Sequence, residues 1–273
     1  MKETTQLDNN VIVSRFGAMT CCASFVAYGG GVNSTAMLIG MYQHGIRPDA
    51  ILFSDTGGER PETYKFISEF SDWLRWHDFP EITILRAPNV TLEERCLNDK
   101  VLPAIAYGFK SCSQRFKIEP QNKFVNNWQL AKETWARGEK VVKYIGYDIE
   151  ETRRAKITED EKYISKYPLI EWEMTRSDCE NLCRKYNLFP AKSSCFFCPS
   201  LKKGEIKQLN REHPDLMQRA LTIEANAELR SIKGLGRRFA WADVIYKDQI
   251  QGKLFAENEC EIEIDLPCGC YDG

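Results

Sequence analysis

Short apolar segments alternate with helical patterns along the first half of the chain, and this alternation constrains the fold most. Residues 23–30 are predicted to form a buried strand, and three later segments repeat the pattern, "DAILFSDTGG", "EITILRAP" and "KVVKYIG". A helix is expected from Ser34 to Gln43, and a second one opens at Pro61. This alternation is typical of a parallel sheet covered on both faces. We therefore predict an α/β fold with a doubly wound, mainly parallel, Rossmann-like sheet.

The character of the sequence changes after about Pro190. The segment "SSCFFCPS" is predicted to be a loop, and two helical stretches follow it, the second opened by Pro214. The chain ends in a strand-like alternation and a cysteine-rich tail, "CEIEIDLPCGCYDG". We therefore expect an α/β domain over residues 1–190 and a cysteine-containing helical appendage with a tail over residues 191–273.

A glycine-rich turn, "YGGGVNST", lies where the first strand passes into the first helix. Such a turn can hold phosphate, because free backbone N–H groups and the positive end of the helix dipole point at the anion. Glycine lets the backbone approach the ligand, while Asn33, Ser34 and Thr35 add hydrogen-bond donors and cap the helix. The turn lacks the lysine and the spacing of a Walker A motif, so a tight turn of purely structural origin is the alternative.

The second predicted strand also ends on a polar, glycine-rich turn, "FSDTGGERPET". Asp55 and Thr56 fall at the carboxyl end of this strand, beside the first glycine turn if the sheet is parallel. Open α/β sheets bind ligands in the crevice at the carboxyl ends of their strands. Two such turns on neighbouring strands favour a ligand site at this edge over a feature of sheet packing.

Composition adds information chiefly through cysteine. The chain has 273 residues and eleven cysteines, an odd number, and its N-terminus resembles neither a signal peptide nor a membrane span. We expect a cytoplasmic protein without a membrane partner, whose cysteines are reduced thiols or metal ligands rather than a disulfide framework. The formal charge of −2 gives no global reason to expect nucleic acid as a partner.

Two close cysteine pairs are candidate metal ligands. Cys195 and Cys198 form a CxxC followed by proline, and Cys268 and Cys270 form a CxC near the C-terminus. Four thiolates can hold one tetrahedral metal or an iron–sulfur cluster, and Cys112 is a fifth candidate. The alternative, that cysteines are small buried apolar residues, fits best the ones on predicted strands and helices: Cys21, Cys22, Cys179 and Cys183.

Five segments, in order from about residue 25 to 200, resemble the signatures of the PP-loop ATP pyrophosphatase superfamily and its phosphoadenosine phosphosulfate (PAPS) reductase-like branch. They are "YGGGVNST", "SDTGGERPET", "SCSQRFKIEP", "IGYDIEETRRAK" and "SSCFFCPS". The resemblance implies an adenine nucleotide alpha hydrolase-like fold that binds ATP, PAPS or APS, with Mg²⁺. It also implies a [4Fe–4S] cluster on Cys112, Cys195 and Cys198, for which the tail could supply a fourth ligand, and Zn²⁺ is the alternative metal.

The same resemblance implies roles for individual residues. Those implied to bind the nucleotide lie in the two glycine turns and the third segment: Gly29, Gly30, Gly31, Asn33, Ser34, Thr35, Asp55, Gly57, Glu59, Arg115 and Lys117. The residues implied to act in catalysis are Asn33, Asp55, Glu151 and Arg154. For the charged members of this set, the alternative interpretation is an ordinary surface ion pair.

The first glycine turn departs from the family pattern at two positions. Gly29 stands where the family has serine, which removes one hydroxyl donor. Asn33 stands where the family has aspartate, and a carboxylate there would help to bind Mg²⁺, a cation that prefers anionic oxygen. Asn33 can still donate to a phosphate oxygen, so we expect nucleotide binding to survive the change better than ATP cleavage does.

Three functions follow from these features. The first is an enzyme that activates a substrate with ATP, releases pyrophosphate and transfers sulfur, with nucleic acid or a sulfur-donor protein as candidate partners. The second is sulfonucleotide reduction, in which a thiolate such as Cys268 in the C-terminal tail attacks sulfur. The third is a non-catalytic nucleotide-binding accessory protein, which Asn33 favours.

Overall fold

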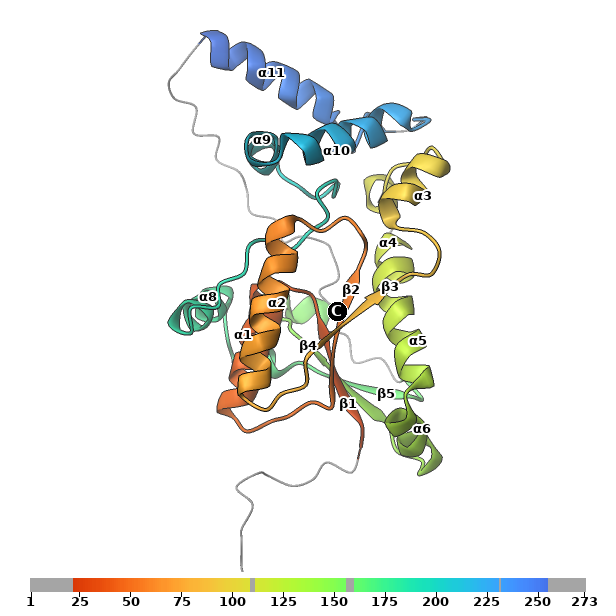
Figure 1. The fold of residues 1–273 in the computed structure, drawn as a ribbon, viewed down its shortest axis with the longest axis vertical. Coiled ribbons are helices and arrows are strands. Elements are labelled where there is room, and N and C mark those ends of the chain that lie inside the picture. Colours follow the sequence, from red (N-terminus) through yellow and green to blue (C-terminus); the bar gives the residue numbers. More distant parts are fainter. Residues whose placement is uncertain (1–21, 109–110, 156–159, 231, 255–273) are drawn as a thin grey trace, which may run out of the picture.

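The computed structural model describes residues 22–108, 111–155, 160–230 and 232–254. Within them, five strands form one sheet with helices on both faces, as Figure 1 shows. The predicted strand-like run and the tail cysteines, Cys268 and Cys270, lie outside the described residues, and so does Cys21. None of the helices in the described ranges is long and apolar enough to cross a membrane.

The sheet is parallel throughout, as predicted. Its strands are β1 (Ser24–Tyr28), β2 (Ala50–Asp55), β3 (Ile82–Arg86), β4 (Val141–Ile145) and β5 (Tyr163–Lys166), in the order β3-β2-β1-β4-β5. Ala27 on the central strand β1 lies opposite Leu52 of β2 and Ile145 of β4. Because the strand order reverses at β1, the crevice between the carboxyl ends of β1 and β4 is where sheets of this topology bind ligands.

Helices cover both faces, which confirms the doubly wound α/β fold. One face is covered by α1 (Val32–Gln43) and α2 (Pro61–Trp76), with α8 (Arg176–Lys185) packed on the outer side of α1, and the other by α5 (Glu119–Asn127) and α6 (Gln129–Ala136) (Figure 1). The apolar positions predicted for α2 face the core: Phe66, Ile67, Phe70 and Leu74 are buried and Trp73 is partly buried.

Helix α1 is buried on almost every side. All residues from Val32 to Met41 are buried, because the sheet lies on one side of the helix and α8 on the other. At Gly40, a Cβ atom would lie 2.4 Å from the ring of Trp172, which follows the short α7 (Pro168–Glu171). The close packing on both sides of α1 holds the whole helix, and with it the start of the helix after the glycine turn, in place.

The remaining helices lie beyond the carboxyl ends of the strands (Figure 1). The two helices predicted after the cysteine loop are α9 (Lys203–Glu212) and α10 (Pro214–Asn226), and α11 (Trp241–Leu254) packs with them. Phe196, Phe197 and Trp241 are buried here, in a core that also includes residues of α3 (Leu92–Asn98) and η1 (Ala104–Tyr107). The cysteine loop is therefore anchored by two neighbouring phenylalanines.

Two helical segments carry residues predicted to bind ligand. Cys112 lies on α4 (Ser111–Ser113), which passes into the π-helical turn η2 (Gln114–Ile118) with Arg115 and Lys117. Glu151 and Arg154 lie on the 3₁₀-helix η3 (Ile149–Arg154), which follows β4. Both segments lie within quoted motifs, but their helical structure was not predicted, since a helix was expected only after "SCSQRFKIEP" and the structure begins it inside that motif.

Cys179 and Cys183 are buried small residues, as predicted. Both are 0% exposed in the core between α8 and α1. Burial raises the pKa of each thiol from 9.0 to about 12, because the thiolate would lose its hydration. The neutral thiols therefore stabilise the folded state below pH 9, and this contribution is lost as the pH rises toward 12.

We expect the free energy of unfolding to fall above pH 9 by about 1.4 kcal/mol per pH unit for each of these thiols. A Cys179→Ala/Cys183→Ala variant should be less stable than the wild type at neutral pH, with a difference that shrinks between about pH 9 and pH 11. Urea unfolding under reducing conditions measures both proteins, and other titrating groups cancel in the comparison. A difference that stays constant with pH would contradict this assignment.

Candidate functional site

The glycine turn between β1 and α1 leaves the start of the helix open. Gly30 has a φ of +73°, a conformation that glycine adopts without strain, and a Cβ atom there would lie 3.2 Å from the ring of Phe53. Gly31 occupies the N-cap position of α1, where no side chain caps the helix, and the first turn contains no acidic residue. The N–H groups of this turn and the positive end of the helix dipole therefore face the crevice.

Two hydroxyls of the predicted phosphate site support the turn from within. Ser34 Oγ donates to the carbonyl of Gly31 at 3.1 Å. Thr35 is fully buried, and its Oγ1 lies 3.1 Å from the phenol oxygen of Tyr28 on β1. The backbone N–H groups, rather than these hydroxyls, are therefore the donors best placed to meet an anion.

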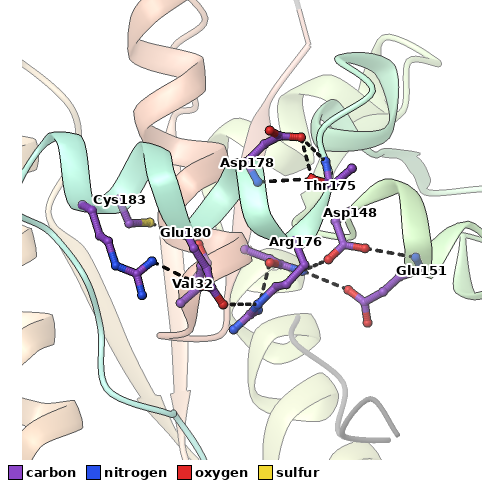
Figure 2. A network of polar contacts seen from close by, with 10 residues as sticks. Val32, Asp148, Glu151, Thr175, Arg176, Asp178, Glu180 and Cys183 are labelled. Atoms are coloured by element: carbon purple, nitrogen blue, oxygen red, sulfur yellow. Dashed lines mark hydrogen bonds and ion pairs between the residues drawn. The ribbon is translucent and has the colours of Figure 1, made fainter. Parts of the chain in front are cut away.

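Asn33 connects the start of α1 to the segment after β4. Its Nδ2 donates to Asp148 Oδ2 at 2.9 Å and to Glu151 Oε2 at 3.1 Å, and its Oδ1 accepts from Arg176 Nη1 at 2.9 Å. Figure 2 shows Asp148 and Glu151 on one side of this contact and Arg176 on the other. Arg154 pairs with Glu151. The Asn33 amide thus lies where two carboxylates converge.

Local geometry explains how the segment after β4 reaches α1. A Cβ atom at Gly146 would lie 2.9 Å from Ser34 Cα, so only glycine allows this approach. Asp148 then caps η3, because its Oδ1 accepts from the N–H groups of Glu150 and Glu151 at 3.0 and 3.1 Å. The capped turn directs Glu151 toward Asn33.

A cavity of about 590 Å³ opens in front of the glycine turn between β1 and α1. That volume lies within the range of small-ligand sites, about 300–1,000 Å³. Its lining combines the turn, the Asn33 network and cationic side chains, including Gly31, Asn33, Asp148, Glu151, Arg176, Lys192 and Lys202. Sequence reasoning missed Asp148, although it lies inside a quoted motif, and no sequence signal pointed to Arg176 or Lys192. Lys202 belongs to a basic cluster with Lys203 and Lys207 that the sequence suggested to be a solvated helix face.

Replacing Asn33 by aspartate should destabilise the protein when Mg²⁺ is absent. The change removes two hydrogen bonds and places a third carboxylate beside Asp148 and Glu151, so we expect a loss of about 1–3 kcal/mol. Carboxylate oxygens are the ligands that Mg²⁺ prefers, so millimolar Mg²⁺ should restore the stability. Urea unfolding with and without Mg²⁺, with the wild type as control, measures this. An Asn33→Asp protein whose stability Mg²⁺ does not change would refute this prediction.

Asp55 organises the turn after β2. It is 1% exposed, and its carboxylate accepts from the N–H of Gly57, the hydroxyl of Tyr64 and Nε of Arg86, each at 2.8 Å. Burial and the bond to Asp55 raise the pKa of Tyr64. Gly57 has a φ of +78° and lines a cavity of about 200 Å³ together with Asp55 and Arg86. Asp55 therefore shapes this cavity, and its role toward a nucleotide or Mg²⁺ stays a prediction.

Cys112, Cys195 and Cys198 line one cavity, although they come from two distant segments. Cys195 Sγ lies 3.0 Å from Thr56 Oγ1 and 4.0 Å from Oε1 of the buried Glu59. Within the described part of the chain, no three His, Cys, Asp or Glu side chains form a group that could hold a single metal ion. The structure thus brings the three thiols to a common space without forming a one-metal site.

Arg115 and Lys117, the two cations predicted to bind anions in the segment "SCSQRFKIEP", have different surroundings. Lys117 lines the cysteine cavity, and its carbonyl accepts from Ser54 Oγ at 2.8 Å. Arg115 is exposed, with its guanidinium 5.8 Å from the ring centroid of Phe116. Lys117 is therefore placed to raise the positive potential around the thiols, and Arg115 stays a predicted anion contact without such a placement.

The cysteine loop joins the cavities along the sheet edge. Ser193 Oγ donates to the carbonyl of Gly29 at 2.7 Å, and Ser193 lines the cavity in front of the glycine turn. The next two residues, Ser194 and Cys195, line the cysteine cavity, and the N–H of Phe196 donates to Gly58 at 2.8 Å. One loop therefore contacts the turns after both β1 and β2.

Fold and site together define a Rossmann-like α/β protein with a glycine turn at the carboxyl edge of its sheet. No protein-family model matches the sequence. The uncharacterized protein MJ0066 of Methanocaldococcus jannaschii is 27% identical over 202 residues, which are 71% of this chain and 40% of that protein. This chain thus spans less than half the length of that relative.

Two solved structures are similar to the chain at low identity. A phosphoadenylyl-sulfate (PAPS) reductase from Candida auris, in a phosphate complex, is 15% identical, with a TM-score of 0.41 over 62% of this chain and 74% of that one. The U34-tRNA thiolase NcsA from Methanococcus maripaludis, with its [4Fe–4S] cluster, is 12% identical, with a TM-score of 0.42 over 90% of this chain and 77% of that one.

Proposed function

We propose that the chain binds ATP or a related adenine nucleotide at the turn of Gly29 to Gly31 and uses it to activate a substrate for sulfur transfer. The observation that supports this most directly is the uncapped first turn of α1, which opens on a cavity of about 590 Å³. Arg176, Lys192 and Lys202 line the same cavity, where Arg176 pairs with Glu180 and Lys192 with Glu205, so a phosphate group would compete with these carboxylates for the cations. A nucleotide site at the carboxyl edge of β1 also agrees with the topology of the sheet.

In this proposal, an oxygen or nitrogen of the substrate attacks the α-phosphorus of ATP. A bond forms between the substrate and the α-phosphoryl group, the bond to the β-phosphate breaks, and pyrophosphate leaves with the electron pair. The N–H groups of α1 and the three cations would bind the phosphates and offset the charge on the departing pyrophosphate. Asp148 and Glu151 offer oxygen ligands that would hold Mg²⁺, which neutralises phosphate charge when bound.

The cysteine cavity supports a [4Fe–4S] cluster held by Cys112, Cys195 and Cys198. Three soft thiols are a donor set that suits a cluster, in which each thiolate would bind a different iron, and the space between them, about 30 Å³, would have to widen to hold it. When bound, a cluster with one iron lacking a protein thiolate can take up sulfide. A zinc ion would instead need ligands from outside the described residues, such as Cys268 and Cys270.

The Asn33 network supports a second candidate, a nucleotide-binding accessory protein that does not cleave ATP. The Asn33 amide already lies between Asp148 and Glu151, with hydrogen bonds of 2.9 and 3.1 Å, where a cation would otherwise compete for these carboxylates. In this candidate the nucleotide binds at the same turn and pyrophosphate is not released.

Calorimetric titration with ATP, AMP and PAPS, followed by a pyrophosphate-release assay with Mg²⁺, tests both candidates. Binding of any of the three nucleotides is expected, and failure of all three to bind would overturn the proposal. Binding together with pyrophosphate release favours the enzyme, and Glu151→Gln should then reduce release more than binding. Binding without release, with Asn33→Asp gaining Mg²⁺-dependent release, favours a weakened catalytic turn.

A further inference from the structure

The connection between α10 and α11 carries a cluster of positive charges. Residues 232–240 include three cationic side chains and no acidic one: Lys233, Arg237 and Arg238. The sequence suggested a solvated helix face here, but the structure shows a loop, which we call the basic loop. All three cations are exposed, and no carboxylate of a described residue pairs with them. Of the flanking acidic residues, Glu228 is engaged by Lys100 at 3.5 Å, and Asp243 is an exposed residue in the first turn of α11.

A buried carboxylate holds the backbone of the basic loop. Glu224 of α10 is 7% exposed, and its carboxylate accepts from three N–H groups at 2.7, 2.9 and 3.0 Å, those of Leu235, Trp241 and Ala242. These donors satisfy its negative charge. Leu235 and Trp241 are themselves 0% exposed, so the middle of the loop and its end are both anchored. Because the loop is ordered in advance, binding a partner would cost little conformational entropy.

Contacts within and beside the basic loop bring the cations together. The N–H of Lys233 donates to the carbonyl of Arg237 at 3.0 Å, and Arg238 follows directly. Lys203, an exposed residue of α9, joins them, since its Nζ lies 6.0 Å from the ring centroid of Phe239. Four cations from two distant segments therefore share one surface.

The basic loop lies on the same side of the molecule as the candidate site. The guanidinium of Arg237 packs on Gly108, where a Cβ atom would overlap with it. Gly108 ends η1, and Ile105 of η1 lines the cysteine cavity together with Cys112. Figure 1 shows α10 and α11 beyond the carboxyl ends of the strands. A partner bound by the loop would thus lie at the end of the molecule where the candidate site opens.

We propose that the basic loop binds the phosphate backbone of a nucleic acid. Such a backbone presents phosphates at short, regular intervals, so it can meet several cations of one surface at once, and guanidinium groups bind each phosphate through two hydrogen bonds. A membrane fits less well, because the apolar side chains of the loop, Ile232 and Leu235, are partly or fully buried. The inference goes beyond the proposed function, since it needs neither a nucleotide nor a metal.

The test measures binding of a fluorescein-labelled single-stranded RNA by fluorescence anisotropy at several salt concentrations, without nucleotide or metal. The wild-type affinity should fall as salt rises, because cations that bind phosphates release counterions. Lys233→Gln/Arg238→Gln removes two of the four cations, so the slope of log K against log salt should fall by about 1.4, and the affinity on the order of 10-fold near 0.1 M salt. Lys132→Gln/Lys185→Gln, which removes the same charge from exposed positions on α6 and α8, should change neither.

Two further variants separate charge from packing and from the nucleotide site. Lys233→Arg/Arg238→Lys keeps both charges and should keep the slope. Gly31→Val should bind RNA as the wild type does, so this inference and the nucleotide proposal can fail independently. A wild-type protein that does not bind RNA, or an unchanged slope in Lys233→Gln/Arg238→Gln, would overturn the proposal. Binding of phosphatidylserine vesicles in place of RNA would assign the loop to a membrane and overturn it as well.

Discussion

Gly31→Val should reduce nucleotide affinity by on the order of 100-fold or more while the fold persists. Gly31 has a φ of −99°, which valine can adopt, so the backbone is not strained. A Cβ atom there would lie 3.4 Å from Ser193 Oγ, and the two methyl groups of valine would extend into the cavity that Gly31 lines. They would cover the N–H groups of α1 that are expected to bind the phosphates.

Gly31 is a better position for this test than the neighbouring Gly30. Gly30 has a φ of +73°, and a Cβ atom would press on Phe53 and Thr63, so valine there would disturb folding as well as binding. Gly138→Asn is a control for replacing a glycine away from the site, because Gly138 lies in open space and asparagine tolerates its positive φ. Calorimetry measures binding and circular dichroism measures folding. ATP binding of wild-type strength by a folded Gly31→Val protein would show that the glycine turn is not the site.

The sequence predicted most of the sheet because its inner strands are apolar and bounded by turns. Residues such as Val26, Leu52 and Val141 are fully buried, so the pattern of β1, β2 and β4 is strong. Strand β5 was missed because it has four residues, Tyr163–Lys166, of which three are exposed. These residues form a strand because they pair in parallel with β4 at the edge of the sheet, and that pairing is a tertiary effect.

For the candidate site, the sequence indicated which segments to examine but not which residues contact one another there. The motifs located Asn33, Glu151 and the cysteine loop, because glycine turns and CxxC pairs are visible locally. The partners of Asn33 are not, since Asp148 and Arg176 are far away along the chain and meet it only where β4 and α8 pack against α1.

Changing Cys195 and Cys198 to serine should remove all bound metal from protein purified without oxygen. Serine replaces a soft thiolate by a hydroxyl that iron and zinc bind far more weakly. Iron, zinc and acid-labile sulfide analysis, together with the visible absorption of a cluster, measures the loss. Cys22→Ser is the control, since it removes a thiol that lies two residues before β1 and does not line the cysteine cavity.

Cys112 decides between the two metals. It lines the same cavity as the CxxC pair, so Cys112→Ser should lose iron and sulfide as completely as the CxxC variant if a cluster is held there. A zinc ion bound by Cys195, Cys198, Cys268 and Cys270 would remain in Cys112→Ser and be lost from Cys268→Ser/Cys270→Ser. Metal that survives replacement of both Cys195 and Cys198, or wild-type protein with no metal at all, would refute the metal centre. Because serine differs from cysteine by one atom, a folded Cys112→Ser protein reports the ligand set rather than the packing of the cavity.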